Sequence, residues 1–393
     1  MGRARGALRI VVLGIMGRTP LAGVVWQAMH YLEGFRRLGH EVVYVEDTGA
    51  WPYDPEQNTL TEDVRYAVQT IEAVMTSLGL PDRWAYRAAP PGNRLFGLGE
   101  AELAHVCRDA DVLVNVTGAA ILREEYLRVP VRIYLETDPV LSQIEAAQGR
   151  ESMVAMLAAH THHFTFGENV GTTECALPVE RVTFQHTRQP VVLDWWATDG
   201  DVGPQGRFTT ISSWRQTEKD IEWNGVTYRW SKHRQFLEFI DLPRRTPAPV
   251  ELALACHEPE AVALLRAHGW QVLDGLAMSR DLHRYRDYIH AAGGEFTVAK
   301  EQYVQWRTGW FSDRSACYLA AGKPVITQDT GFDRILPTGL GLFAFTTMDD
   351  VLGAMDALAR DYPAHARAAR KIAGEYFQAE RVLDELLAGA GAA

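Results

Sequence analysis

The stretch RTGWFSDRSACYLAAGKPVITQDTGFD, residues 307–333, decides how the rest of the chain is interpreted. Ser312 is suited to cap the start of a helix. Gly322 is suited to end that helix, because glycine tolerates the left-handed conformation after a last turn. The apolar run at 324–327 is typical of a short buried strand. The stretch therefore predicts a loop, a short helix, a tight turn and a strand, with residues 329–331 in the loop beyond it.

The start of this helix is a candidate phosphate site. The first backbone N–H groups of a helix have no partner within it and can bind a phosphate. Arg314 and Ser315 add a cation and a hydroxyl beside Ser312, and arginine is suited to bidentate phosphate recognition. Asp313 opposes a dianion here unless its side chain points away. The alternative is that Arg314 is a solvated helix residue and Ser312 only caps the helix.

Apolar runs alternate with helical patterns on either side of a polar stretch at 198–206, which holds three glycines and one proline. This alternation predicts an α/β fold of two Rossmann-like, doubly wound parallel-sheet domains facing a cleft. The expected boundaries are 1–197 for the first domain, 207–370 for the second, and 371–393 for a last helix, which the resemblance described below implies can cross back to the first domain. The strands are expected at 8–13, 41–45, 111–116, 131–135, 163–166, 208–211, 250–255, 270–273, 295–299 and 324–327, with long helices at 60–78, 348–360 and 363–387.

The composition excludes several classes of protein. The chain has 39 Lys and Arg against 50 Asp and Glu, which gives a net charge of −11 and argues against nucleic acid or an anionic membrane as a partner. No apolar stretch approaches the roughly 18 residues of a membrane span. The four cysteines form no CxxC pair and predict free thiols in a reducing compartment. We therefore expect a cytoplasmic protein without a transmembrane segment.

In this order and spacing, these features resemble the GT-B glycosyltransferases, in particular bacterial members of the family-1 type. The residues that carry the resemblance are the polar helix start at Ser312, the Gly-x-Pro turn from Gly322 to Pro324, the glycine-bearing loop at 14–23 and the segment FTTISSWR at 208–215. The resemblance implies a metal-independent hexosyltransferase that needs no cofactor. It would move a sugar from a nucleotide-diphosphate donor to a small-molecule or glycan acceptor.

The resemblance also implies where each substrate binds. The donor diphosphate would lie on the helix start, with its ribose or sugar near the loop that follows the next strand, and the acceptor beside Gly17 and Arg18. Lys219 is a further candidate cation, and Trp214 is a candidate to stack on a base or sugar, although most buried tryptophans belong to a core. The expected donor-side residues are Trp214, Arg215, Lys300, Ser312, Arg314, Ser315, Asp329, Thr330 and Gly331.

The usual catalytic patterns of such enzymes are absent. The paired glutamates of many retaining members would fall at Gly309 and Cys317, and the loop at 14–19 lacks the histidine of inverting members. A base near the acceptor hydroxyl is still needed if the transfer inverts. Asp138 is the first candidate because it follows the strand at 131–135, and Glu136 and Asp47 come next. The alternative is that Asp138 only caps a helix.

Other functions remain open on sequence alone. A nicotinamide dehydrogenase would use the glycines after the first strand with Glu46 or Asp47, but GxGxxG is absent. A sugar-nucleotide epimerase would use the same phosphate site. A non-catalytic sugar-nucleotide-binding protein is the third alternative, because both usual catalytic patterns are missing. The histidines at 160, 162 and 163 lack a recognisable further ligand, so no metal site is expected.

Overall fold

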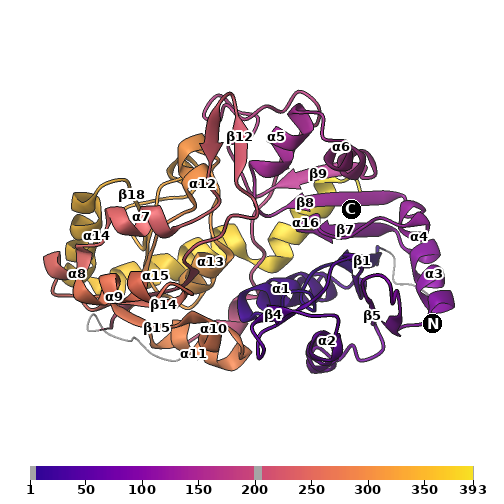
Figure 1. Cartoon of the computed structure of the whole chain (residues 1–393), viewed down its shortest axis with the longest axis horizontal. Helices are drawn as coiled ribbons and strands as arrows, with labels where there is room; N and C mark the ends of the chain where they lie inside the picture. Colours follow the sequence, from indigo (N-terminus) through magenta and orange to yellow (C-terminus); the bar gives the residue numbers. More distant parts are fainter. Residues whose placement is uncertain (1–5, 199–205, 393) are drawn as a thin grey trace.

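The computed structural model describes residues 6–198 and 206–392, and its core is two separate β-sheets (Figure 1). The first sheet runs in the order β10-β9-β8-β7-β1-β2-β5-β6, and only its edge strand β6 is antiparallel. The sequence pattern predicted most of these strands to within a residue or two, whereas β5, β6 and β10 were not expected. The bounds are β1 (Arg9–Leu13), β2 (Glu41–Glu46), β5 (Trp84–Arg87), β6 (Leu95–Gly97), β7 (Val112–Val116), β8 (Val131–Glu136), β9 (His162–Thr165) and β10 (Gln185–His186).

The second sheet is entirely parallel and runs in the order β15-β14-β11-β16-β17-β18. In both sheets the order reverses beside the first strand, between β1 and β7 and between β11 and β16, which is the doubly wound Rossmann arrangement that the sequence predicted. The bounds are β11 (Phe208–Ser213), β14 (Val250–Ala255), β15 (Gln271–Asp274), β16 (Gly294–Thr297), β17 (Val325–Gln328) and β18 (Leu342–Phe345).

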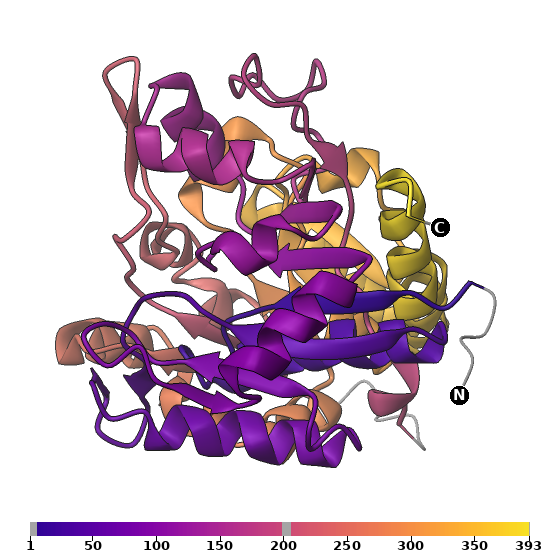
Figure 2. The same ribbon diagram turned by 90° about the vertical axis from the view of Figure 1, so that its right-hand side faces the viewer.

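Helices cover both faces of each sheet (Figure 2). Ile10 and Val12 of β1 pack on the side of α1, whereas Val11 and Leu13 pack on the side of α3. This burial on both faces explains why the sequence of β1 is a nearly continuous apolar run. The helices are α1 (Ala22–Arg37), α2 (Arg65–Ser77), α3 (Glu100–Asp109), α4 (Glu124–Leu127), α5 (Leu141–Ala147), α6 (Glu151–Ala158), α7 (His233–Glu238), α8 (Leu242–Arg245), α9 (Pro259–Ala267), α10 (Gly275–Ser279), α11 (Leu282–Ala291), α12 (Glu301–Trp306), α13 (Asp313–Ala320), α14 (Met348–Arg360), α15 (Tyr362–Ile372) and α16 (Ala379–Gly389).

Two short hairpins lie outside the sheets, and one of them corrects a prediction. β3 (Tyr53–Asp54) pairs with β4 (Thr59–Leu60), and β12 (Ile221–Trp223) pairs with β13 (Val226–Tyr228). The helix expected from residue 60 therefore begins only at Arg65. The reason is local, because the Asp54 carboxylate accepts hydrogen bonds from the backbone N–H groups of Glu56 and Gln57 and closes a turn.

The prediction of one helix over 363–387 is wrong, because α15 and α16 are separated by a π-helical turn, η3 (Ala373–Phe377). Here the backbone leaves the helix to bond with Val191 of the first half of the chain. Val191 N donates to Phe377 O at 2.7 Å, and Ala379 N donates to Val191 O at 2.9 Å. The yellow helix α16 thereby crosses to the first sheet (Figure 1), where Leu383 packs against Gly34 of α1.

The stretch at 198–206 that we expected to separate the domains lies almost entirely outside the described residues. Two three-residue 3₁₀ turns, η1 (Leu193–Trp195) and η2 (Phe332–Arg334), complete the described elements. Throughout 6–198 and 206–392, no helix combines the length and hydrophobicity that crossing a bilayer requires.

Candidate functional site

The carboxyl ends of both sheets face a shared cleft of about 880 Å³. Its walls come from the segments that follow β1, β7 and β8 on one side and β11 and β16 on the other. Ligands of open parallel sheets bind outside the carboxyl ends of the strands, where the strand order reverses. Both reversals lie at this cleft, which makes it the candidate site.

Cations gather on the second-sheet side of the cleft, where Lys219, Lys232, Lys300 and Arg314 line the wall. The Lys300 ammonium lies 3.5 Å from the centroid of the Trp230 ring, and the Lys219 ammonium lies 4.7 Å from it. Burial lowers the pKa of Lys300 to about 8, against the opposing effect of the Asp138 carboxylate. Trp230 therefore holds two ammonium groups close together at the reversal point.

Asp138 joins the two sides of the cleft. Its carboxylate lies 2.9 Å from the Lys300 ammonium and 3.2 Å from the Lys219 ammonium, and it accepts a hydrogen bond from the Tyr303 hydroxyl. Burial alone would raise the pKa of Asp138, but the two ammonium groups outweigh this effect and hold the pKa well below its usual range. In this state Asp138 is a weak base, because both of its oxygens are already occupied.

Lys232 is a cation that the sequence did not single out. Its side chain is buried, with 7% of the residue exposed, and it lines the cleft. Burial lowers its pKa well below the usual value, and the positive charges of Arg314 and Lys300 lower it further. Among the described residues we find no ion pair or hydrogen bond to its ammonium. An anion in the cleft would stabilise the charged form of Lys232, since an unpaired buried charge is unfavourable.

The predicted phosphate site at the start of α13 is only partly open to the cleft. Ser312 and Arg314 line the cleft, but Ser315 is fully buried behind them. The Arg314 guanidinium lies 2.5 Å from the Glu295 carboxylate and donates to Ile211 O at 2.8 Å. Asp313 also lines the cleft, and burial raises its pKa to about 6. The helix start therefore supplies the cleft with a hydroxyl and a partly neutralised arginine.

Five more predicted donor-side residues do not line the cleft: Trp214, Arg215, Asp329, Thr330 and Gly331. Trp214 is in the core of the second domain, where it stacks on Phe236 of α7. Arg215 pairs at 2.6 Å with Glu258, and both side chains are exposed to solvent. The roles of these five residues in donor binding remain predictions, whereas Lys219, the further candidate cation after β11, lines the cleft.

The loop that contains Asp329, Thr330 and Gly331 is fixed within the second domain and contacts the first domain at Gly331. Asp329 lies 3.1 Å from Arg307, and the Thr330 hydroxyl donates to Trp310 O at 2.6 Å. Gly331 has a φ of +90°, and a side chain at this position would meet Asn169 of the first domain at 2.5 Å. Glycine is thus required here by the close approach of the two domains.

On the first-sheet side, Arg18 lines the cleft and Gly17 lies behind it. The buried Glu46 carboxylate holds this loop, since it accepts hydrogen bonds from Gly17 N at 2.7 Å, from Tyr44 Oη at 2.8 Å and from Arg18 N. Burial raises the pKa of Glu46 to about 7. A dehydrogenase would need a free carboxylate at the end of this strand for the cofactor ribose, and Glu46 is not free.

Of the other candidate bases, Glu136 faces the cleft and Asp47 does not. Asp47 is buried between Arg87, at 3.0 Å, and Arg123, at 2.5 Å. Glu136 Oε2 accepts hydrogen bonds from Thr165 Oγ1 and from Gln143 Nε2, both at 2.6 Å. Its other oxygen, Oε1, has no hydrogen-bond partner in the described part of the chain. Burial raises the pKa of Glu136 to about 8, so this carboxyl is mostly protonated at neutral pH.

In the histidine cluster at the start of β9, ring nitrogens of His160 and His163 are within hydrogen-bond distance of neighbouring groups of the fold. The two ring nitrogens of His160 lie 2.7 Å from Met156 O and 3.2 Å from Asn115 Nδ2, and His163 Nε2 lies 2.8 Å from Leu157 O. Within 6–198 and 206–392 no group of three or more His, Cys, Asp or Glu side chains is placed to hold a metal ion. All four cysteines are unpaired.

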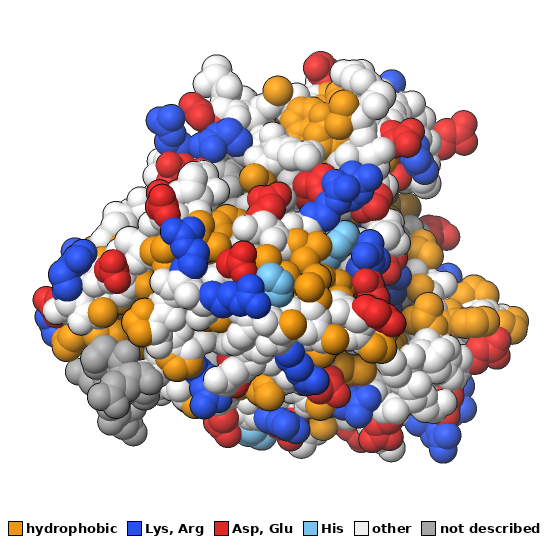
Figure 3. All heavy atoms as spheres, turned by 60° about the vertical axis from the view of Figure 1, so that its left-hand side comes forward, with side chains coloured by type: hydrophobic (Ala, Val, Ile, Leu, Met, Phe, Trp, Pro, Cys, Tyr) orange, Lys and Arg blue, Asp and Glu red, His pale blue; other side chains and the backbone are white. Residues whose placement is uncertain are grey.

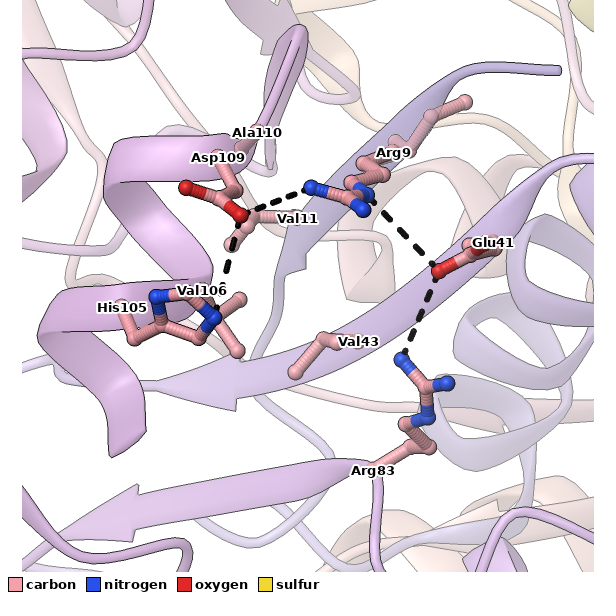
Figure 4. Close-up of a pocket in the computed structure, with 10 residues that line it drawn as sticks. Arg9, Val11, Glu41, Val43, Arg83, His105, Val106, Asp109 and Ala110 are labelled. Atoms are coloured by element: carbon pink, nitrogen blue, oxygen red, sulfur yellow. Dashed lines mark hydrogen bonds and ion pairs between the residues drawn. The ribbon is translucent and has the colours of Figure 1, made fainter. Parts of the chain in front are cut away.

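A second hollow, of about 160 Å³, lies at the opposite ends of β1 and β2 (Figure 4). Arg9 lies 2.8 Å from Asp109 and 3.9 Å from Glu41, and Arg83 lies 3.8 Å from Glu41. These charges neutralise one another across the hollow. It therefore offers no unpaired group to a ligand, in contrast to the cleft.

Several solved structures share this fold over 97–98% of the chain. Anabaena HepE, in complex with UDP and glucose, has a TM-score of 0.57 at 11% identity, covering 97% of this chain and 99% of that one. An alpha-glucosyltransferase in complex with UDP and DNA has a TM-score of 0.61 at 10% identity, covering 98% and 100%. AviGT4, a glycosyltransferase of avilamycin A biosynthesis, has a TM-score of 0.55 at 15% identity, covering 98% and 97%.

The chain has the GT-B fold. The likeness extends over both domains of each of these glycosyltransferases, as the sequence resemblance predicted. No protein-family model and no curated protein sequence matches the chain. At identities of 10–15% the GT-B likeness establishes the architecture alone. The function is therefore inferred from the residues that line the cleft.

Proposed function

We propose that the protein is a glycosyltransferase that moves a sugar, of the hexose type, from a nucleotide-diphosphate donor to an acceptor hydroxyl. The observation that carries the proposal is the group of Lys219, Lys232 and Lys300 at the strand reversal of the second sheet. Three ammonium groups can neutralise a diphosphate, and this supports transfer without a metal ion. The GT-B neighbours solved with UDP or UDP-glucose support a nucleotide sugar as the donor.

In the proposed reaction, the bond from the anomeric carbon to the diphosphate breaks and a bond to the acceptor oxygen forms. The leaving diphosphate takes the electron pair and is stabilised by the lysines. The acceptor hydroxyl loses its proton to a base. Asp138 can serve as this base only after Lys219 and Lys300 turn from its carboxylate to the diphosphate, since at present they hold its pKa low. Donor binding would thus activate Asp138.

Isothermal titration calorimetry with UDP tests the donor site. We expect Lys232→Met to weaken UDP binding at least about tenfold, because removing a charged partner of a phosphate loses about 1.5–3 kcal/mol. Lys371→Met is the matched control, since Lys371 is an exposed lysine on α15 with 73% of its side chain accessible. Equal UDP affinity in both variants, or binding of NAD and not of any nucleoside diphosphate, would contradict the proposal.

Two alternatives use the same site and differ in their products. A sugar-nucleotide epimerase would convert one free sugar nucleotide into another, and a non-catalytic binding protein would leave the donor intact. A transferase releases the nucleoside diphosphate when it meets an acceptor, and slowly with water. One GT-B neighbour was solved with DNA, so the expectation that this chain has no nucleic-acid partner also awaits a binding test. The cytoplasmic location remains a prediction.

A further inference from the structure

The first-sheet side of the cleft differs in polarity from the cationic side opposite. Its partly exposed side chains are mainly apolar, and they come from α1, the β3–β4 hairpin, α5 and α6. Binding a molecule against such a wall removes apolar surface from water, which favours an apolar ligand. The residues that form this apolar wall are Ile15, Leu21, Val24, Leu60, Leu141 and Met153.

The apolar wall continues to the outer edge of the cleft. Leu60 of β4 is 63% exposed and also lines the cleft. Single exposed apolar residues are ordinary. However, the position of Leu60 in the lining extends the apolar wall toward solvent. The hairpin is fixed to the cleft, because Tyr53 N donates to Arg18 O at 2.8 Å.

The charge of this side disfavours a polyanionic acceptor. Arg18 is its only cation among the described lining residues. A nucleic acid is bound by several cations that neutralise its phosphates. Figure 3, in which the second-domain side of the molecule comes forward, shows basic and acidic side chains interspersed on that outer face. The wall therefore fits a neutral molecule.

At the inner end of the apolar wall lies one polar group without a complete set of partners. Glu136 and Leu141 belong to the same β8–α5 connection, and both line the cleft. Because Thr165 and Gln143 both bond to Oε2, Oε1 is the oxygen left for a ligand. A buried carboxyl oxygen without a partner favours a ligand that brings a hydroxyl to it.

We infer that the acceptor is a small, largely apolar or aromatic alcohol or phenol, which packs on the apolar wall with its hydroxyl oxygen accepting a hydrogen bond from the Glu136 carboxyl. The inference rests on the proposed function, since it describes the acceptor of that reaction. It separates this chain from a neighbour that was solved with DNA, although the two share a fold.

Calorimetric binding of 4-methylumbelliferone, a phenolic coumarin, tests the inference with and without UDP. We expect Leu60→Glu to weaken coumarin binding about tenfold, because a charge replaces an apolar contact in the wall. Leu340→Glu is the matched control, since Leu340 is 51% exposed and lies between β17 and β18. Both leucines are exposed, so neither substitution removes a core residue.

A second variant tests the role of Glu136. The wild-type protein should bind 4-methylumbelliferone several-fold more tightly than 4-methylcoumarin, which lacks the hydroxyl, and Glu136→Met, which removes the polar group at similar length, should abolish this preference. Coumarin binding that Leu60→Glu does not weaken, or tighter binding of cellobiose or a short DNA duplex, would overturn the inference. The UDP titration decides the donor site separately: bound UDP without bound coumarin refutes only the acceptor, and bound coumarin without UDP refutes the transferase.

Discussion

At the scale of single residues, Asp138 forms ion pairs with lysines that would otherwise be free to bind a donor diphosphate. Its carboxylate lies within 3.2 Å of the ammonium groups of both Lys219 and Lys300. A diphosphate must compete with this carboxylate for them. We therefore expect Asp138→Asn to tighten UDP binding about tenfold, because a neutral amide competes much less for a cation in a site of low dielectric constant.

The same substitution should slow transfer if Asp138 is the base, so affinity and rate would change in opposite directions. UDP titrations and single-turnover rates measure the two effects. Asp63→Asn is a suitable control, because Asp63 pairs locally with Arg65 outside the cleft. Weaker UDP binding in Asp138→Asn would mean that the carboxylate positions the lysines and does not compete with the donor.

The two tryptophans near the cleft illustrate what sequence could and could not predict at this scale. Trp214 and Trp230 both lie in the segment after β11. Trp214 turns into the core and stacks on Phe236, whereas Trp230 lies beneath Lys300. Trp230 and Lys232 reach the cleft because the β12–β13 hairpin redirects the chain, and that hairpin is too short to leave an apolar pattern. Lys300 was predictable, because it follows β16 closely and strand ends face the cleft.

At the scale of elements, α16 completes the first domain. A side chain at Gly34 of α1 would meet the Leu383 side chain at 2.5 Å, so the two helices are in very close contact. Leu383 is fully buried. We expect Leu383→Ala to lower the free energy of unfolding by about 2–5 kcal/mol, as for other buried leucines.

Denaturation in urea measures this change, with Leu340→Ala as the exposed control that should alter stability by less than about 0.5 kcal/mol. An equally small effect of Leu383→Ala would show that α16 contributes little to the first domain. The crossing itself was implied by the resemblance to GT-B glycosyltransferases. Its break at η3 was not, because the partner of the diverted backbone, Val191, lies about half the chain away in sequence.

At the scale of the whole molecule, the domains are joined by hydrogen bonds from side chains to backbone carbonyls. Asn169 Nδ2 donates to Arg307 O at 3.0 Å and to Gly331 O at 3.1 Å, and Gln189 Nε2 donates to Phe311 O at 2.6 Å. In the reverse direction, Trp310 Nε1 donates to Thr137 O at 2.9 Å. Such bonds couple the domains, so we expect one unfolding transition in calorimetry.

Asn169→Ala should weaken this coupling. The two carbonyls would lose a donor in a buried place, which costs about 1–3 kcal/mol, and the single transition should broaden or split. Thr172→Ala, which removes a hydroxyl that bonds only locally, to Asn169 O and Glu174 N, controls for local effects on the same loop. A sharp, unchanged transition in Asn169→Ala would indicate that apolar packing alone couples the domains.

The crossing of α16 also affects how the protein folds during its synthesis. Domains generally fold one after another as the ribosome delivers them, the N-terminal one first. Here the face of α1 around Gly34 stays uncovered until Leu383 has left the exit tunnel. The first domain, although synthesised first, therefore cannot reach its final packing before the second is made. Chaperones that bind apolar surface on nascent chains would therefore stay bound longest at α1.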